Sequence, residues 1–223
     1  MNVMDDFKLK GKVALVTGGA RHLGYDMADA LAEAGADVVL TSRDAASAVA
    51  AAEKLRAARG VDTLGLGVNV VRHPEVADMA RRARDWKGRI DILVNNAGGT
   101  PPERGPACLF DRDPKAIAEL LEVNLLGTLY CCKEVGRIMI EQKRGKIINI
   151  ASIAGMVGRD RRMYQRNNMN GQPVDYAAAK AGIIGATYDL AALMGPFGVC
   201  VNAISPGGFA RSQPGNFERD YSD

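Results

Sequence analysis

The sequence predicts an α/β fold in which a doubly wound parallel sheet carries helices on both faces. Apolar runs alternate along the chain with segments of helical periodicity, and a glycine-rich turn joins the first run to the first helical segment. This alternation favours parallel strands, and right-handed crossovers between them give the strand order 3-2-1-4-5-6. We expect strands near residues 12–17, 37–41, 62–70, 90–94, 146–151 and 199–204, and helices near 23–34, 44–59, 74–87, 114–142 and 176–194.

The size and composition are those of one globular domain over residues 1–223. Hydrophobic residues make up 47% of the chain and charged residues 25%, which is ordinary for a globular protein. The net charge is only +3 and the basic residues are scattered, so we expect no nucleic-acid partner. Because no apolar run approaches the ~20 residues of a spanning helix, we expect no membrane segment.

The cysteines and the N-terminal segment bear on metal binding and location. No Cys-x-x-Cys pair occurs among Cys108, Cys131, Cys132 and Cys200, and the chain has 2 histidines, so we expect no metal site. Residues 1–12 carry charges without the apolar core of a signal peptide. Both features favour a reducing, cytoplasmic location.

The first strand leads into a turn suited to a pyrophosphate. The apolar run 13–16 precedes segment 17–24, Thr-Gly-Gly-Ala-Arg-His-Leu-Gly, and a helical segment and a second strand follow. Glycines let backbone N–H groups approach phosphates, and the start of the helix adds favourable partial charge. The dinucleotide contacts expected in this unit are Gly18, Arg21, His22, Leu23 and Gly24.

A tyrosine and a lysine four positions apart form a candidate acid–base pair. Tyr176 and Lys180 are expected on the same face of a helix. A free phenol has a pKa of about 10, and we expect the nearby ammonium to lower the pKa of Tyr176 so that it exchanges a proton near neutral pH. An isolated pair of this kind is more often an ordinary helix surface, so its context decides.

Further motifs occur in order along the chain. They are residues 7–13, Phe-Lys-Leu-Lys-Gly-Lys-Val; 95–98, Asn-Asn-Ala-Gly; 122–128, Glu-Val-Asn-Leu-Leu-Gly-Thr; 146–152, Lys-Ile-Ile-Asn-Ile-Ala-Ser; and 202–207, Asn-Ala-Ile-Ser-Pro-Gly. Together with the glycine turn and the Tyr176–Lys180 pair, these motifs make nearly the whole chain resemble the short-chain dehydrogenase/reductase family.

The resemblance implies a Rossmann-like fold, a bound nicotinamide cofactor and a catalytic group of Asn124, Ser152, Tyr176 and Lys180. Tyr176 is then the acid in carbonyl reduction and the base in alcohol oxidation, and Ser152 hydrogen-bonds the reacting oxygen. Lys180 also holds the nicotinamide ribose, and Asn124 anchors a water in a proton relay. Taken singly, Ser152 could instead cap a turn, and Asn124 could satisfy a buried backbone group. Further cofactor contacts are implied at Asn69, Val70, Asn96, Ala97, Gly98, Tyr176, Lys180, Pro206 and Gly207.

The end of the second strand bears on the choice between NAD(H) and NADP(H). An acid there selects NAD(H), whereas an arginine accommodates a 2′-phosphate. Ser42 stands where the family's NAD-selecting acid is expected, Arg43 follows it, and Arg21 is a second cation within reach of the phosphate. We therefore expect NADP(H). In the alternative, Arg43 begins a solvated turn with Asp44 as its partner.

Three features depart from the family pattern. His22 stands where the middle glycine is usual; it is tolerated if this position needs a positive φ, and donation to a phosphate is the other interpretation. Segment 159–173 lengthens the stretch between Ser152 and Tyr176 and reads as a polar loop. The family continues into a seventh strand that the residues up to Asp223 do not supply, and its usual threonine is not evident in residues 208–211. Either the chain is shortened or the lid over the cofactor is unusual.

The inserted segment bears on the substrate. Its arginines, Arg159, Arg161, Arg162 and Arg166, could attract a carboxylate or phosphate, which favours a polar, sugar-like substrate. A solvated insertion or a subunit contact explains these arginines equally well.

The expected function is NADP(H)-dependent hydride transfer between the nicotinamide and a small-molecule carbonyl or secondary alcohol. Reduction of a 3-oxoacyl thioester is an alternative, because the core motifs are shared with those reductases. An NADP-binding sensor or scaffold without turnover is the alternative of another class. Broad apolar faces near 114–142 and after Tyr176, with the pairing of these helices in the family, imply a homodimer or homotetramer.

Overall fold

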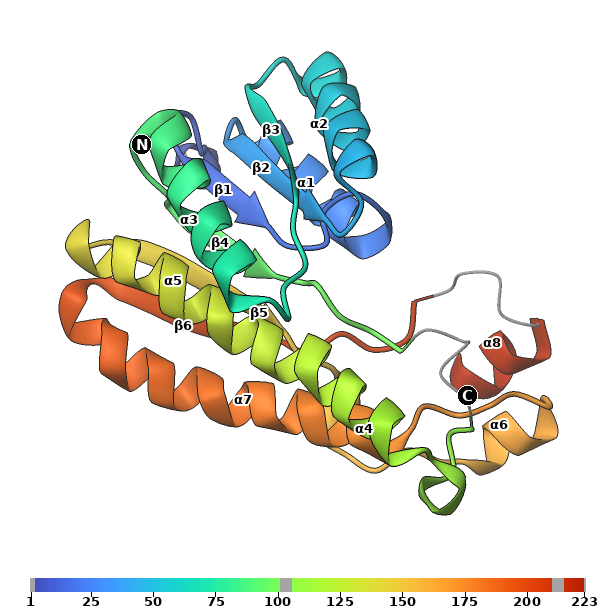
Figure 1. The fold of residues 1–223 in the computed structure, drawn as a ribbon. Coiled ribbons are helices and arrows are strands. Elements are labelled where there is room, and N and C mark those ends of the chain that lie inside the picture. The colour runs from blue at the N-terminus through green and yellow to red at the C-terminus, as the bar shows by residue number, and fades with distance from the viewer. Residues whose placement is uncertain (1–2, 101–105, 210–214, 223) are drawn as a thin grey trace.

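The computed structural model describes residues 3–100, 106–209 and 215–222, and a parallel sheet lies at its centre (Figure 1). The strands in the described residues are β1 (Val13–Val16), β2 (Asp37–Ser42), β3 (Thr63–Gly67), β4 (Ile92–Asn95), β5 (Gly145–Ile150) and β6 (Val199–Ile204). Their order is β3-β2-β1-β4-β5-β6, and every neighbouring pair is parallel. The predicted doubly wound order is therefore confirmed.

Helices cover the sheet in two layers (Figure 1). One face carries α1 (His22–Glu33) and α2 (Ala45–Arg59), and the other carries α3 (His73–Lys87), α5 (Gly127–Glu141) and α7 (Val174–Met194). Shorter elements are η1 (Val3–Phe7), η2 (Leu109–Asp111), α4 (Pro114–Leu121), η4 (Ile153–Gly155), α6 (Arg162–Arg166), η5 (Gly195–Phe197) and α8 (Gly215–Ser222). No helix within the described part of the chain has the length and apolar character needed to cross a bilayer.

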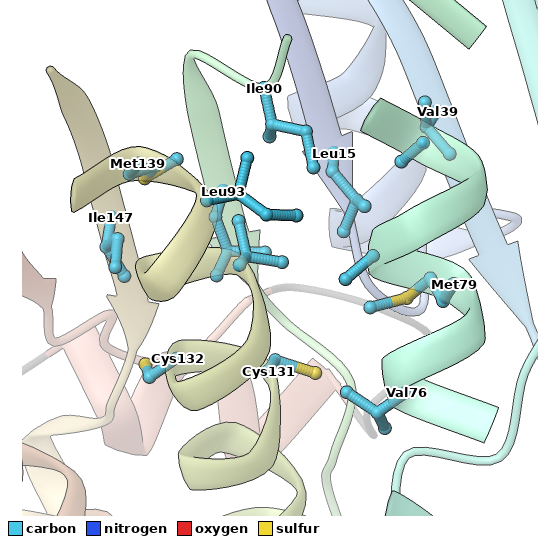
Figure 2. Close-up of a cluster of buried hydrophobic side chains, with 14 of the residues drawn as sticks. Leu15, Val39, Val76, Met79, Ile90, Leu93, Cys131, Cys132, Met139 and Ile147 are labelled. Atoms are coloured by element: carbon cyan, nitrogen blue, oxygen red, sulfur yellow. The ribbon is translucent and has the colours of Figure 1, made fainter. Parts of the chain in front are cut away.

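The larger hydrophobic core fills the space between the sheet and helices α3 and α5. Figure 2 shows Leu15 and Leu93 from the central strands facing Met79 of α3 and Met139 of α5. Apolar side chains removed from water in this way supply most of the favourable free energy of folding. Cys131 and Cys132 belong to this core as free thiols.

Three predicted elements differ in detail from the structure. The single helix expected near 114–142 consists of α4, the turn η3 (Glu122–Leu126) and α5 in direct succession. The turn η3 is π-helical, because the Gly127 N–H donates to the carbonyl of Glu122. The strand expected near 62–70 ends at Gly67. The loop expected over 159–173 contains α6. The backbone N–H of Arg162, at the start of this helix, donates to the Asp160 carboxylate at 2.9 Å.

A buried carboxylate joins the starts of β1 and β4. Asp91 is 6% exposed, accepts from the backbone N–H of Val13 at 3.0 Å and pairs with Arg89. Burial raises the pKa of Asp91, but the Arg89 guanidinium and the Val13 N–H together outweigh it and hold that pKa below its usual value. Asp91 therefore stabilises the fold as a carboxylate, and it brings together the two strands that precede the turns at Gly18 and Asn96.

Asp91→Asn should lower the free energy of unfolding by about 1–3 kcal/mol at neutral pH, because a charged acceptor of buried hydrogen bonds is lost. A carboxyl group whose pKa is lower in the folded state stabilises the fold above its unfolded pKa, near 4, and loses that contribution as pH falls through the folded pKa. Urea unfolding should therefore show a smaller difference between the two proteins in acid. The exposed Asp85→Asn is the control, with an expected change below about 0.5 kcal/mol. An equal loss at both pH values would contradict the prediction.

Candidate active site

Two adjoining cavities open at the carboxyl edge of the sheet. The first, of about 320 Å³, lies beyond β1, β2 and β4, and the second, of about 600 Å³, lies beyond β5 and β6. Leu23, Asn96, Gly98 and Gly99 line both, so the cavities are neighbours. Open α/β sheets bind their ligands at this edge.

The glycine-rich turn after β1 forms the floor of the first cavity. Gly18 has φ of +63°, and a Cβ on Gly24 would lie 2.2 Å from the Gly18 carbonyl oxygen and 2.5 Å from Asn96 Nδ2. Only glycine fits at such an approach. The Asn96 amide donates to the carbonyls of Thr17 (3.0 Å) and Gly18 (3.2 Å), so β4 fixes the shape of the turn.

His22 is accommodated by its backbone conformation. It begins α1 with φ of +53°, in the left-handed region where histidine is better tolerated than a β-branched residue. Its side chain is exposed and lines the first cavity. His22 therefore has the positive φ that its interpretation as a tolerated substitution requires.

Two arginines and a serine lie at the end of the first cavity beside β2. Arg21, Ser42 and Arg43 line it, and no acid is found among its described lining residues. Asp44 is not the partner of Arg43, since its carboxylate caps α2 by accepting from the N–H groups of Ala46 and Ser47. Within the described residues, neither Arg21 nor Arg43 forms an ion pair.

Most of the expected cofactor contacts lie on these cavities. The first cavity is lined by Gly18, Arg21, His22, Leu23, Gly24, Ser42, Arg43, Val70, Asn96, Ala97 and Gly98. The second is lined by Tyr176, Lys180, Pro206 and Gly207. Asn69 lies outside both linings, because its side chain turns back to accept from the N–H of Val71 at 3.4 Å. Of residues 208–211, Ala210 and Arg211 lie outside the described residues.

Ser152, Tyr176 and Lys180 meet on the second cavity. Ser152 follows β5 and caps η4, its Oγ accepting from the N–H of Ala154 at 3.2 Å, and its side chain also hydrogen-bonds Tyr176. Lys180 lies one turn beyond Tyr176 on α7 and donates from Nζ to the Ile150 carbonyl at 2.7 Å. The turn-capping role of Ser152 and its place beside the phenol are therefore both present.

The pKa values in this cluster differ from the sequence-based expectation. Burial raises the pKa of Tyr176, while the Ser152 hydrogen bond and the Arg159 charge lower it by less, so the net shift is upward. The expected lowering by Lys180 is not found. Burial also lowers the pKa of Lys180 to about 8, and its Nζ lies 5.6 Å from the centre of the Tyr176 ring. Desolvation outweighs the attraction between ammonium and phenolate here.

Asn124 is buried in the π turn and hydrogen-bonds backbone groups. Its Oδ1 accepts from the Gly99 N–H at 2.8 Å, and its Nδ2 donates to the carbonyls of Gly99 and Leu120, both at 3.0 Å. It lies outside the linings of both cavities. The side chain thus fixes the turn after β4, which corresponds to the backbone-satisfying alternative for this residue.

The arginines of the inserted segment are mostly bound to neighbouring protein groups. Arg162 pairs with Asp160, Arg166 pairs with Asp220 of α8 at 3.3 Å, and Arg159 donates to the Gln172 side chain at 2.6 Å. None of the four predicted arginines is among the lining residues of the second cavity. The expectation that they gather around an anionic substrate is therefore not supported by their placement.

Sequence reasoning missed the outer wall of the second cavity. The inserted segment and the chain after β6 come together there, with the rings of Tyr164 and Phe217 at 5.1 Å and α6 beside α8 (Figure 1). The missed lining residues are Thr100, Ile150, Ala151, Tyr164, Met169, Asn170, Gln172, Gly208, Phe209 and Phe217. A single polar segment carries no periodic signal, so it could not indicate which of its side chains face inward.

Sequence reasoning missed fewer of the residues that line the first cavity. They are Ala20, Thr41, Val68, Gly99 and Val123.

The site as a whole suits a nicotinamide dinucleotide. The first cavity offers a glycine turn at a helix start and two arginines, and the adjoining cavity offers a phenol and an ammonium.

Known proteins are similar to this chain in sequence and in fold. The family model for short chain dehydrogenase matches residues 12–220. The chain is 35% identical over 212 residues to a 3-oxoacyl-[acyl-carrier-protein] reductase of Synechocystis sp., which covers 95% of this chain and 80% of that one. It is also 35% identical to a 2-dehydro-3-deoxy-D-gluconate 5-dehydrogenase of Formosa agariphila, with 94% and 74% covered.

A solved structure has a similar fold as well. NAD+-bound xylitol dehydrogenase superposes with a TM-score of 0.81 at 31% identity, covering 96% of this chain and 75% of that one. The chain belongs to the short-chain dehydrogenase/reductase family of oxidoreductases.

Proposed function

We propose that this protein is an NADP(H)-dependent oxidoreductase that interconverts a small carbonyl compound and its secondary alcohol. The observation that carries the proposal is the meeting of Ser152, Tyr176 and Lys180 on a cavity that adjoins the glycine-turn cavity. A protein that only binds a dinucleotide has no need of a half-buried phenol, a serine hydroxyl and an ammonium at that place. The amide side chains of Asn170 and Gln172 on the same cavity support a hydroxylated, sugar-like substrate.

The bound nicotinamide would donate or accept the hydride, and the protein supplies proton transfer and orientation. Tyr176 donates its phenolic proton to the carbonyl oxygen in reduction and recovers it in oxidation. Ser152 donates its hydroxyl hydrogen to the same oxygen, while its Oγ accepts from the Ala154 N–H. The Lys180 ammonium is held by the Ile150 carbonyl and keeps further N–H groups for the ribose and the phenol.

The preference for NADP(H) is supported by the end of the first cavity. Arg21 and Arg43 line it beside Ser42, and both side chains are exposed and outside any ion pair of the described residues. A 2′-phosphate would gain charge-assisted hydrogen bonds there, whereas the ribose hydroxyls of NAD(H) would find no carboxylate among the described lining residues.

Reduction of a 3-oxoacyl thioester is the second candidate. It is favoured by the 35% identity to a 3-oxoacyl-[acyl-carrier-protein] reductase over most of both chains. An assay of NADPH consumption with keto-sugars and with 3-oxoacyl thioesters distinguishes the two substrate classes.

Exposed Tyr188 and Leu193 on α7 support a homodimer or homotetramer, and four free cysteines support a cytoplasmic location.

Tyr176→Phe should lower kcat by about 10²–10⁴-fold, because the proton donor is lost while the ring still fills its place. The dissociation constant for NADPH, measured by fluorescence titration, should change by less than about threefold. Tyr164→Phe, on the same cavity, is the matched control and should keep kcat within about threefold. Unchanged turnover in Tyr176→Phe would remove the proposed mechanism, and cofactor binding without turnover in the parent protein would favour a sensor.

Arg43→Ala should weaken NADPH binding about 10-fold or more and leave NADH binding nearly unchanged, since only the former carries the 2′-phosphate. The ratio of kcat/KM for the two cofactors reports the change. Arg21→Ala should act in the same direction. Arg56→Ala, on the surface of α2, is the control. Equal losses for both cofactors would show that these arginines do not discriminate between them.

Arg159→Gln should raise the pKa of Tyr176, because the Arg159 charge lowers it in the parent protein. Oxidation requires the deprotonated phenol, so the rise of kcat/KM with pH should move to higher pH. Arg159→Lys keeps the charge and should move the profile less. Arg161→Gln, in the same segment, should leave it in place. A downward shift in Arg159→Gln would contradict this assignment.

A further inference from the structure

A buried ion pair lies immediately beside the candidate acid–base residue. The guanidinium Nη2 of Arg112 is 2.5 Å from Oδ2 of Asp175, and their side chains are 1% and 2% exposed. Taking two such charges out of water costs several kcal/mol per ion, which their attraction offsets only in a close geometry. Neither residue lines the two cavities.

The pair joins two segments that are 63 positions apart in the sequence. Arg112 directly follows η2, and its Nη1 also donates to the Pro106 carbonyl at 3.3 Å, so it holds segment 106–112 together. Asp175 is the second residue of α7, and Tyr176 is the next. The pair therefore attaches segment 106–112 to the first turn of α7, the helix that carries Tyr176 and Lys180.

The first turn of α7 begins without a side-chain cap. The carbonyl of its N-cap residue, Pro173, accepts from Arg159 Nη2 at 3.5 Å, Tyr176 hydrogen-bonds Ser152, and the Lys180 bond to Ile150 acts one turn further along. The first turn of a helix leaves N–H groups without intrahelical partners and frays readily. A buried anion at this end, fixed by a cation from another segment, opposes that fraying.

We propose that Arg112 and Asp175 are positioning residues that hold the first turn of α7 so that the Tyr176 phenol stays beside Ser152. The proposal rests on the proposed function of Tyr176. Because a misplacement of about 1 Å can cost 10²-fold in rate, a pair that touches neither substrate nor cofactor can still control turnover.

A purely structural role is the competing explanation, and a double variant separates the two. Removing one partner leaves a buried charge and destabilises the fold, whereas replacing both with apolar residues of similar size is often neutral for stability. We expect Arg112→Met and Asp175→Leu each to lower the melting temperature. The double variant Arg112→Met/Asp175→Leu should largely recover it.

In the stable double variant, kcat should remain about 10-fold or more below that of the parent protein. KM for NADPH should change by less than about threefold, because the pair lies away from the first cavity. Arg59→Met removes the partner of Asp29 on the outer surface of α1 and α2 and is the control for loss of an arginine. It should leave kcat unchanged. Recovery of kcat together with the melting temperature would overturn the proposal.

A second readout needs no cofactor. The ultraviolet absorbance of tyrosinate, titrated in each protein and in its Tyr176→Phe derivative, gives the pKa of Tyr176 by difference. Ser152 and Arg159 act on the pKa of the phenol, Lys180 Nζ lies 5.6 Å from its ring centre, and the neutral amides of Asn170 and Gln172 line the same cavity. Release of the first turn should expose the phenol and move its pKa toward the ordinary value of about 10. An unmoved pKa in the double variant counts against positioning.

Asp175→Glu covers the case in which the double variant does not fold. It keeps the charge but lengthens the side chain, so it should fold and show a reduced kcat with a shifted tyrosinate titration. A parent-like kcat and titration in this variant overturn the proposal. Absence of any turnover in the parent protein would instead refute the proposed function, while the titration would still test the placement of Tyr176.

Discussion

The contact between α7 and the end of β5 is the constraint on which the site depends. Lys180 reaches the Ile150 carbonyl at 2.7 Å, and a Cβ on Gly155 would lie 2.6 Å from the backbone nitrogen of Ala181. Further along the helix, the buried Asn149 amide donates to Thr187 at 3.0 Å. These contacts fix α7 against β5. They bring the Tyr176 phenol beside the Ser152 hydroxyl, although the two residues lie far apart in the sequence.

The cofactor side depends on an equally close approach. Gly24 brings α1 against the Gly18 carbonyl, and the Asn96 amide spans the gap to β4. Leu23, Asn96, Gly98 and Gly99 form the boundary between the two cavities, so the turn after β4 belongs to both. Asn124 in turn fixes Gly99 from the π turn. The groups proposed to hold a dinucleotide and those proposed to transfer a proton thus share one supporting frame.

The sequence predicts the strand order and the main site motifs because both are encoded locally. Apolar runs specify strands, and glycine turns and the Tyr176–Lys180 spacing act within a few residues. Contacts between distant segments leave no such signal. The Arg112–Asp175 pair, the Tyr164–Phe217 contact and the turning of Asn124 toward Gly99 each need the assembled fold. The pKa of Tyr176 was misjudged for the same reason, since its burial depends on packing rather than on its helix neighbour.

The π turn has a consequence for how this chain can vary in length. Each residue of an α-helix advances the rotation by about 100°, and a π turn takes up one residue more than an α turn. Deleting one residue from Glu122–Leu126 would therefore restore a regular α-helix and leave α4 and α5 near their present relative rotation. The deletion would remove the local widening of the helix that presents the Asn124 side chain to the backbone of Gly99. The extra residue thus serves the turn after β4 rather than the packing of α4 and α5, and a homologue without it would have to hold that turn by another group.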